Sequence, residues 1–305
     1  GSYMLIDPSK GDARTPLQVG TDGRPNDMIA SRSYIAWQRV GGGSLQVAPW
    51  VIRAYDRRSR QTVTVARSHQ ISGHKPPPVP KFTGVTVAGR HLAWARVDSW
   101  PKSRAKPVVN IYGVDLRTGD EPRLLARDAM MPVATAKGVV YARTHYVHPG
   151  TPKDVFTIHR VGWRGGQDTV LFRGHFPARR VLGGLAAHGH RVAWITAGNP
   201  DALTLLDLST GKRQVFTDVR KGCFGYPILT DIFLTWSDGN CSGAVKRVGY
   251  VYIFSSDRLR SVGNSPGLYP TRANGRLLDW TFSHSGTGNE QSLRDRVVEI
   301  LPRSS

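Results

Sequence analysis

Short apolar runs alternate with polar turns along the whole chain, and one combination recurs. The run "HLAWARV" at residues 91–97 is followed by "IYGVDLRTGD" at residues 111–120. A similar pair, "RVAWITAG" and "TLLDLSTGKR", stands at residues 191–198 and 204–213. Runs of this length, rich in β-branched and aromatic residues and bounded by Gly, Asn and Asp, predict β-strands joined by tight turns.

An aromatic residue holds the same place in six copies of the first run. The copies follow one another at intervals of roughly 40 to 60 residues, a period typical of propeller repeats. The six aromatic residues are Trp37, Trp94, Tyr141, Trp194, Trp236 and Trp280. We interpret their rings as packing anchors between neighbouring sheets, because large aromatic side chains dominate core packing.

The surroundings of each copy predict four short antiparallel strands per unit, A to D, with the aromatic residue on strand B. Units of this size with no helical periodicity between them indicate an all-β, six-bladed β-propeller. We expect residues 1–305 to form one domain. Residues 1–14 are expected to be a tag remnant and an N-terminal extension.

The two ends of the chain suggest how the ring closes. The last unit offers strands A, B and C, the third at residues 295–301, but no strand D. Residues 15–20, "TPLQVG", resemble a strand D without a blade. Pairing of this segment with residues 295–301 would remove two exposed sheet edges. Residues 4–12 could compete for the third position of the last blade, for which we favour the C-terminal segment.

The repeats resemble those of the TolB-like proteins. The resemblance rests on "HLAWARV" followed by "NIYGVDLRTGDEPRLLAR", and on "RVAWITAG" followed by "LTLLDLSTGKRQVF". It implies a six-bladed propeller of the kind that serves as a binding scaffold or as a domain attached to hydrolases. It transfers no catalytic residue to this chain.

Charge points to an anionic partner. The chain carries 42 Lys and Arg against 22 Asp and Glu, for a formal net charge of +20. Such an excess favours an acidic glycan or an acidic protein surface. Nucleic acid is an unlikely partner because no recognition module is present. No apolar run reaches about 18 residues, so no membrane span is predicted, and we expect a monomer.

Ligand-binding residues are expected on the long B–C and D–A loops, which share one face of a propeller. Long loops on a rigid scaffold are where binding residues concentrate. Cationic, aromatic and imidazole side chains there would suit an acidic sugar. The candidates are His69, His74, Lys75, Trp100, Lys102, Arg104, His145, His148, Arg179, Arg180 and His284.

Catalysis has weaker support. A glycosidase needs two carboxyl groups about 5 to 10 Å apart, and Asp98 and Asp238 each follow a strand B on the loop face. A lyase for an acidic polysaccharide would instead use His or Tyr as base and Arg to neutralise the substrate, with His145 and His284 as candidates. The H-x-x-H pair at residues 145–148 fixes no ligand geometry on a loop, so we expect neither a metal nor a cofactor.

The two cysteines fall on the same predicted face. Cys223 lies in the D–A loop that enters the fifth blade, and Cys241 lies in the B–C loop of that blade. We expect a disulfide between them, which favours a secreted, periplasmic or cell-envelope protein whose signal peptide has been removed.

The combined features favour a binding propeller without catalysis. The alternative is a polysaccharide lyase or glycoside hydrolase that acts on an acidic glycan in the central funnel. A weaker alternative is a protein-interaction scaffold of an envelope complex.

Overall fold

The computed structural model describes most of the chain. It describes residues 2–7, 13–18, 25–40, 48–68, 84–99, 107–145, 154–176, 181–198, 201–217, 223–225, 227–239, 246–266, 269–274, 277–285 and 291–299. Within these, the description of residues 2–18, 25–27, 223, 238–239, 246–247 and 263–299 is of the backbone.

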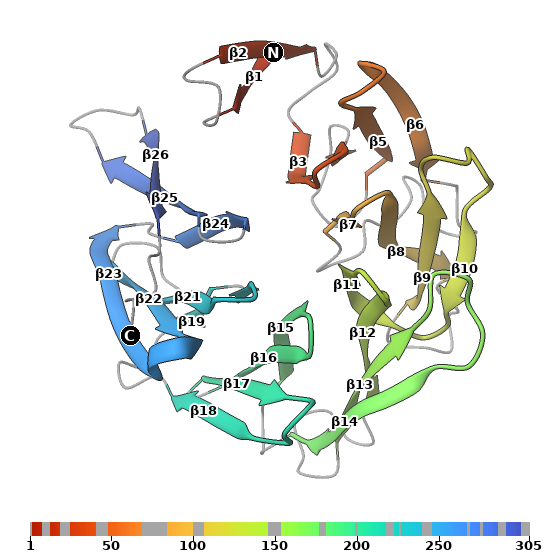
Figure 1. Cartoon of the computed structure of the whole chain (residues 1–305). Coiled ribbons are helices and arrows are strands. Elements are labelled where there is room, and N and C mark those ends of the chain that lie inside the picture. The colour runs from red at the N-terminus through yellow and green to blue at the C-terminus, as the bar shows by residue number, and fades with distance from the viewer. Residues whose placement is uncertain are drawn as a thin grey trace. The chain divides into compact units, whose positions relative to one another are not determined.

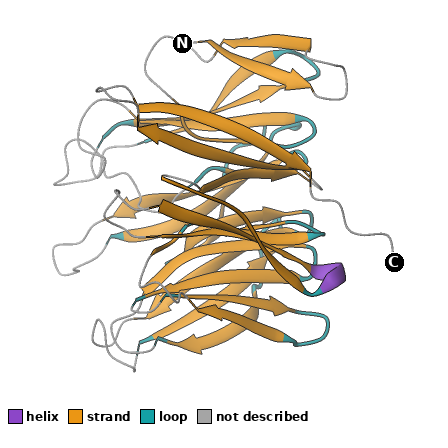
Figure 2. Ribbon diagram, turned by 90° about the vertical axis from the view of Figure 1, so that its left-hand side faces the viewer, coloured by secondary structure: helices purple, strands orange, loops and turns teal. Residues whose placement is uncertain are grey.

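The described chain is almost entirely β-strand, apart from one short 3-10 helix, η2 (Phe254–Ser256) (Figure 2). It divides into two compact units. Unit 1 comprises residues 1–132 and 163–165, and unit 2 comprises residues 133–162 and 166–305. No helix in the described part has the length and apolar character needed to cross a membrane.

Unit 1 contains three antiparallel sheets, each made of strands consecutive in the chain (Figure 1). The first is a hairpin of β1 (Ser2–Asp7) and β2 (Ala13–Gln18). The second contains β3 (Pro25–Ala30), β4 (Tyr34–Val40), β5 (Trp50–Asp56) and β6 (Gln61–Arg67). The third contains β7 (Thr86–Ala88), β8 (His91–Ser99), β9 (Val108–Asp115) and β10 (Arg123–Ala126).

Unit 2 repeats this arrangement, although its first strand begins in unit 1. One sheet contains β11 (Met130–Thr135), β12 (Gly138–His145), β13 (Val155–Val161) and β14 (Thr169–His175). The next contains β15 (Val181–His188), β16 (Arg191–Ala197), β17 (Ala202–Asp207) and β18 (Arg213–Thr217). The third contains β19 (Cys223–Phe224), β20 (Ile228–Leu229), β21 (Phe233–Gly239), β22 (Lys246–Ile253) and β23 (Arg258–Pro266). The last contains β24 (Tyr269–Asn274), β25 (Leu277–Ser285) and β26 (Gln291–Glu299).

The recurring aromatic residues lie where the repeat places them. Each stands on the strand predicted as strand B, namely β4, β8, β12, β16, β21 or β25, and a residue of the next strand lies directly opposite it. The five whose side chains are described are at most 2% exposed, namely Trp37, Trp94, Tyr141, Trp194 and Trp236. All five rings are therefore buried, as a packing role requires.

Three of these rings join successive sheets within a unit, which confirms their expected role as packing anchors. Trp94 belongs to an apolar cluster with Trp50 and Ile52 of the preceding sheet. Trp194 packs on the Phe172 ring, with 4.5 Å between centroids. Trp236 joins a cluster from the β15–β18 sheet that includes Ile195, Leu203 and Leu205. In all three cases the aromatic ring packs on the sheet that precedes it in the chain.

The chain ends pair differently from the expectation. The C-terminal segment supplies the third strand of the last sheet, because β26 pairs with β25, as we favoured. The pairing of residues 15–20 with residues 295–301 is not found, since β2 pairs with β1 and, among the described strands, with no other. A hairpin partner a few residues away costs less loop-closure entropy than a strand from the far end of the chain.

Candidate functional site

Four polar side chains meet in unit 1 where β8 ends and β9 begins. Arg96 and Asp98 lie on one face of β8, because side chains two residues apart share a face. Asn110 lies directly opposite Arg96 in the register, and Tyr112 lies opposite Trp94. We call the group of Arg96, Asp98, Asn110 and Tyr112 the Arg96 cluster.

Asp98 is the acceptor at the centre of this cluster. Its Oδ1 accepts a hydrogen bond from Arg96 Nε at 2.6 Å, and its Oδ2 accepts from Tyr112 Oη at 2.6 Å and from Asn110 Nδ2. Burial works against ionisation, but the hydrogen bonds from Tyr112, Asn110 and Arg96 outweigh it and lower the pKa of Asp98. Asp98 is therefore a carboxylate at neutral pH, engaged by three donors.

Arg96 is held in place by the same partners. One Nη donates to Tyr112 Oη, and the guanidinium carbon lies 3.8 Å from the centroid of the Tyr112 ring. The Arg96 side chain keeps 29% of its surface exposed. A guanidinium anchored through Nε and one Nη can still present its other Nη to a ligand, in the planar geometry that carboxylates and phosphates favour.

Asn110 connects the Arg96 cluster to the chain segment that enters the next sheet. Its Oδ1 accepts a hydrogen bond from the backbone N–H of Asp128 at 3.0 Å. The neighbouring N–H of Ala129 donates to Val109 O at 2.8 Å. The connection between β10 and β11 is thus fastened beside the Arg96 cluster.

A second polar cluster lies in unit 2, on the β11–β14 sheet. Asp168, in the connection between β13 and β14, accepts hydrogen bonds at Oδ2 from Arg143 Nη1 at 2.8 Å and from Tyr141 Oη. His159 Nδ1 lies 3.1 Å from the same oxygen, and His159 Nε2 lies 2.7 Å from Thr157 Oγ1. We call these five residues the Asp168 cluster.

The electrostatics of the Asp168 cluster favour one protonation state. Burial and the hydrogen bond to Asp168 raise the pKa of Tyr141. Burial and the positive charge of Arg143 lower the pKa of His159. Burial opposes the ionisation of Asp168, but Tyr141 and Arg143 outweigh it and lower the pKa of Asp168. At neutral pH the cluster holds a neutral phenol, a neutral imidazole and an ionised carboxylate.

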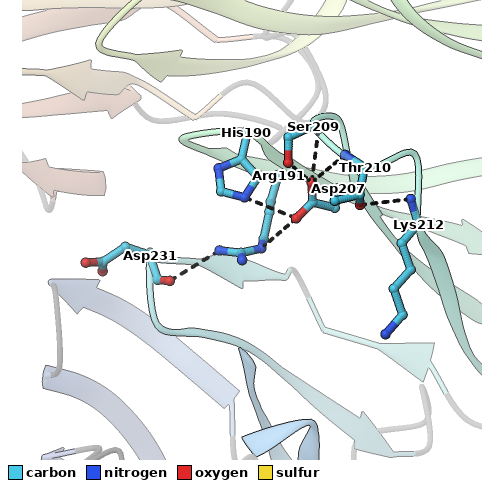
Figure 3. A network of polar contacts seen from close by, with 7 residues as sticks. All are labelled: His190, Arg191, Asp207, Ser209, Thr210, Lys212 and Asp231. Atoms are coloured by element: carbon cyan, nitrogen blue, oxygen red, sulfur yellow. Dashed lines mark hydrogen bonds and ion pairs between the residues drawn. The ribbon is translucent and has the colours of Figure 1, made fainter. Parts of the chain in front are cut away.

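Other aspartate carboxylates stabilise turns by accepting hydrogen bonds from the backbone. In Figure 3, Asp207 lies between the turn that it begins and the side chains of His190 and Arg191. Its Oδ1 accepts from the N–H groups of Ser209 and Thr210, and its Oδ2 lies 3.1 Å from His190 Nε2. Burial is outweighed by the hydrogen bonds from Ser209 and Thr210 and by the nearby His190, which bring the pKa of Asp207 to about 2. This contact set is what a turn needs, since Asp commonly bonds to the backbone two residues on.

Asp201 has a related role where β17 begins. It is 3% exposed, its Oδ1 accepts from the N–H of Gly198 at 2.6 Å, and its Oδ2 accepts from the N–H of Phe224 at 2.9 Å. Asp201 therefore ties the β16–β17 connection to strand β19 of the next sheet. Asp154, directly before β13, is similarly buried. An aspartate that immediately precedes the third strand of a repeat is therefore the sequence signal by which Asp154 and Asp201 could have been found.

The structure describes only some of the residues predicted to form a site. Asp98 belongs to the Arg96 cluster, and His145 is the exposed last residue of β12. Asp238, His284 and Cys223 lie on β21, β25 and β19, where the description covers the backbone. The others lie outside the described residues: His69, His74, Lys75, Trp100, Lys102, Arg104, His148, Arg179, Arg180 and Cys241. The expected disulfide lies outside the described residues as well.

Sequence reasoning missed Arg96, Asn110 and Tyr112. A signal was present, because an arginine stands two residues after the aromatic residue in three copies of the repeat, as Arg39, Arg96 and Arg143. Within the described ranges, no group of three or more His, Cys, Asp or Glu side chains could hold a metal ion.

Comparison with known proteins identifies the fold. No protein family model and no curated protein sequence matches the chain. An acylaminoacyl peptidase from Pyrococcus horikoshii is similar with a TM-score of 0.58 and 10% identity, over 92% of this chain and 46% of that one. The β-propeller domain of the Trilobed protease from Pyrococcus furiosus gives 0.50 and 12%, over 72% and 69%. An oligogalacturonate lyase from Vibrio parahaemolyticus gives 0.52 and 12%, over 98% and 82%.

These similarities define the class of fold: the chain has the β-propeller fold. It spans less than half the length of the acylaminoacyl peptidase. The kinship with TolB-like proteins stays a prediction, since no sequence family matches.

Proposed function

We propose that the chain is an extracytoplasmic propeller that binds an acidic glycan or an acidic protein through the ends of the sheets from which the predicted B–C loops depart. The observation that carries this proposal is the Arg96 cluster. It fixes a partly exposed guanidinium at the base of the connection formed by residues 100–106. That connection contains Lys102, Arg104, Lys106 and Trp100 and no carboxylate, a combination suited to an anionic sugar.

We further propose that six of the sheets are the six blades of one propeller. Each of these sheets is made from consecutive strands, and the β1–β2 hairpin stands outside them. This supports a ring whose first and last blades do not exchange a strand. The propeller domain of the Trilobed protease, which shares the fold, has an open velcro topology.

A glycan array tests the binding function. The purified chain is applied to uronic-acid-rich, sulfated and neutral glycans at low and high salt. We expect binding to the acidic glycans that weakens as salt rises, because exposed charges are screened. Arg96→Ala should lower the affinity about tenfold, as one charged contact is worth roughly 1.5 kcal/mol.

Arg213→Ala is the matched control, since it removes one exposed arginine from β18. It should leave glycan binding within about twofold of the unmodified chain. Equal losses of glycan affinity for Arg96→Ala and Arg213→Ala would count against the proposal. Equal binding to acidic and neutral glycans would also count against it.

A lyase is the second candidate, and the likeness to an oligogalacturonate lyase is the observation that favours it. A lyase for an acidic polysaccharide needs a base that the polymer can reach. His145, exposed at the end of β12, meets this condition, whereas Tyr141 and His159 of the Asp168 cluster are buried. Incubation with polygalacturonate and detection of unsaturated products by ultraviolet absorbance would test this candidate, and His145→Gln should abolish any activity found.

The scaffold hypothesis predicts a stable partner protein instead. Chemical crosslinking in the native envelope, followed by mass spectrometry, would identify such a partner.

A further inference from the structure

The end of unit 1 opposite the Arg96 cluster carries a concentration of exposed arginines. They occupy four turns: β3–β4, β5–β6, β7–β8 and β9–β10. All of these arginines are exposed. We call this set the turn-end arginine patch, and its members are Arg32, Arg57, Arg58, Arg60, Arg90 and Arg117.

Hydrogen bonds between the turns make the patch continuous. The N–H of Arg57 donates to Ser33 O at 3.0 Å, which joins the β3–β4 and β5–β6 turns. Ser31 Oγ donates to Gly89 O at 2.7 Å, which joins the β3–β4 turn to the β7–β8 turn. The N–H of Leu116 donates to Arg90 O at 2.9 Å, which adds the β9–β10 turn. All four turns therefore lie at one end of unit 1.

Carboxylates at this end are too few to neutralise the patch. Asp56 uses its Oδ1 to accept the N–H groups of Arg58 and Ser59. Asp115 accepts the N–H of Arg117 and contacts Arg90 Nε at 2.9 Å. These two carboxylates face six guanidinium groups.

Three further charged residues border the patch and leave its net charge positive: Asp120, Glu121 and Arg123. Asp120 contacts Arg123 at 3.8 Å. With them included, seven arginines stand against four carboxylates. Within the described part of the chain, no ion pair engages Arg58, Arg60 or Arg117.

The chemistry of the patch fits phosphate groups spread over a surface. Guanidinium groups bind phosphate oxygens in a bidentate manner. Turn tips project from a sheet, so their cations can meet a flat array of phosphates. The aromatic residues beneath them, Tyr34 and Tyr55, are at most 9% exposed. The half-buried Trp163 ring beside the patch is already stacked on His91, with 4.7 Å between centroids. The patch therefore offers no row of free aromatic rings for successive bases, which single-stranded nucleic acid would require.

We propose that the turn-end arginine patch docks the protein on a membrane surface rich in anionic phospholipid headgroups. This goes beyond the proposed glycan binding, which uses the other end of the strands. Docking by this patch would leave the Arg96 cluster directed away from the membrane.

Cosedimentation with vesicles tests the proposal. The full chain is mixed with vesicles of phosphatidylcholine alone or with a third phosphatidylglycerol, at low and high salt. We expect association with the anionic vesicles only, and weaker association at high salt. The double variant Arg58→Ala/Arg60→Ala should weaken association about 25-fold, since each arginine near an anionic surface contributes roughly fivefold.

The matched control is Arg258→Ala/Arg260→Ala, which removes two exposed arginines from β23 in unit 2. It should weaken vesicle association by less than about threefold. Equal losses for the two double variants would overturn the proposal in favour of net charge alone. Absence of vesicle association would overturn it, and so would tighter binding to duplex DNA with the same arginine dependence.

Glycan binding separates this proposal from the proposed function. Arg58→Ala/Arg60→Ala should retain binding on the glycan array, whereas Arg96→Ala should retain vesicle association. Each proposal can therefore fail while the other stands.

Discussion

The Arg96 cluster of unit 1 and the Asp168 cluster of unit 2 are two versions of one arrangement. In both, an arginine follows the buried aromatic residue of the second strand by two positions, and a tyrosine hydroxyl and the arginine contact the same carboxylate side chain. The source of the carboxylate differs. Asp98 is two residues from Arg96 on the same strand, whereas Asp168 comes from the β13–β14 connection.

The difference shows what the repeat specifies. It fixes the position of the cation, because strand periodicity and register are the same in both sheets. Each sheet then obtains its counter-ion independently. In unit 1 the counter-ion comes from the same strand as the arginine, whereas in unit 2 the counter-ion belongs to a connection and also lies beside a buried histidine.

The largest effect should come from removing the counter-ion in unit 2. Asp168→Ala leaves Arg143, Tyr141 and His159 without their common acceptor, so it should lower the free energy of unfolding by about 3 kcal/mol. Urea denaturation measures the loss. Asp231→Ala, at an exposed residue, is the control and should change stability by less than about 0.5 kcal/mol.

The equivalent substitution in unit 1 should lower the free energy of unfolding by less. Asp98→Ala frees three donors but, unlike Asp168→Ala, leaves no buried phenol or imidazole without its carboxylate, so we expect a loss of about 2 kcal/mol. The same denaturation experiment measures it. A cost equal to or larger than that of Asp168→Ala would contradict the distinction between a counter-ion on the same strand and one that belongs to a connection.

Acid should affect the unit 2 cluster before the unit 1 cluster. The pKa of His159 is lowered in the folded chain, so the unfolded chain binds the proton more readily. Stability from this group is present above the ordinary value of 6.5 and is lost as pH falls below it. Asp98 has a lowered pKa and loses its contribution only as pH falls below 3.8.

Denaturation midpoints measured between pH 7 and pH 5 should therefore decline in the unmodified chain, by less than either Asp substitution causes. His159→Gln should reduce this decline but not abolish it, because burial also lowers the pKa of His91. Asp98→Ala should leave the decline in place. An undiminished decline in His159→Gln would assign the whole titration to His91.

The smallest effect should come from the edge of the Asp168 cluster. Thr157→Val keeps the shape of the side chain and removes the hydroxyl that contacts His159 Nε2. We expect a loss of about 0.5 to 1 kcal/mol, the usual net worth of one hydrogen bond. Thermal unfolding followed by circular dichroism is sensitive enough to detect it.

The strands and their buried faces were predictable from the sequence because both follow from local pattern. Trp94 and its equivalents recur at the same place in each repeat, on strands whose side chains alternate between the two faces of the sheet. Tight turns such as that at Gly89, with φ of 58°, separate these strands from the preceding ones. The Arg96 cluster was within reach of the same reasoning. Its members lie on two adjacent strands, and Arg96 and Asn110 are directly opposite each other in the register.

The Asp168 cluster was not predictable in this way. Asp168 reaches Tyr141 and Arg143 through the path of an irregular connection, and no periodicity specifies that path. The β1–β2 pairing escaped prediction for a related reason, since a local hairpin competed with a distant strand of similar pattern. Asp98 is a candidate for a central funnel by its place in the repeat, yet its described contacts are all on its own sheet.

The construction of each sheet from neighbouring strands has a consequence for synthesis on the ribosome. Every sheet after the first hairpin is complete once a single continuous stretch of chain has emerged. Low contact order of this kind favours rapid formation of each sheet, and we expect the sheets to form in order during translation. The slow step that remains is the docking of finished sheets on one another through their buried aromatic rings.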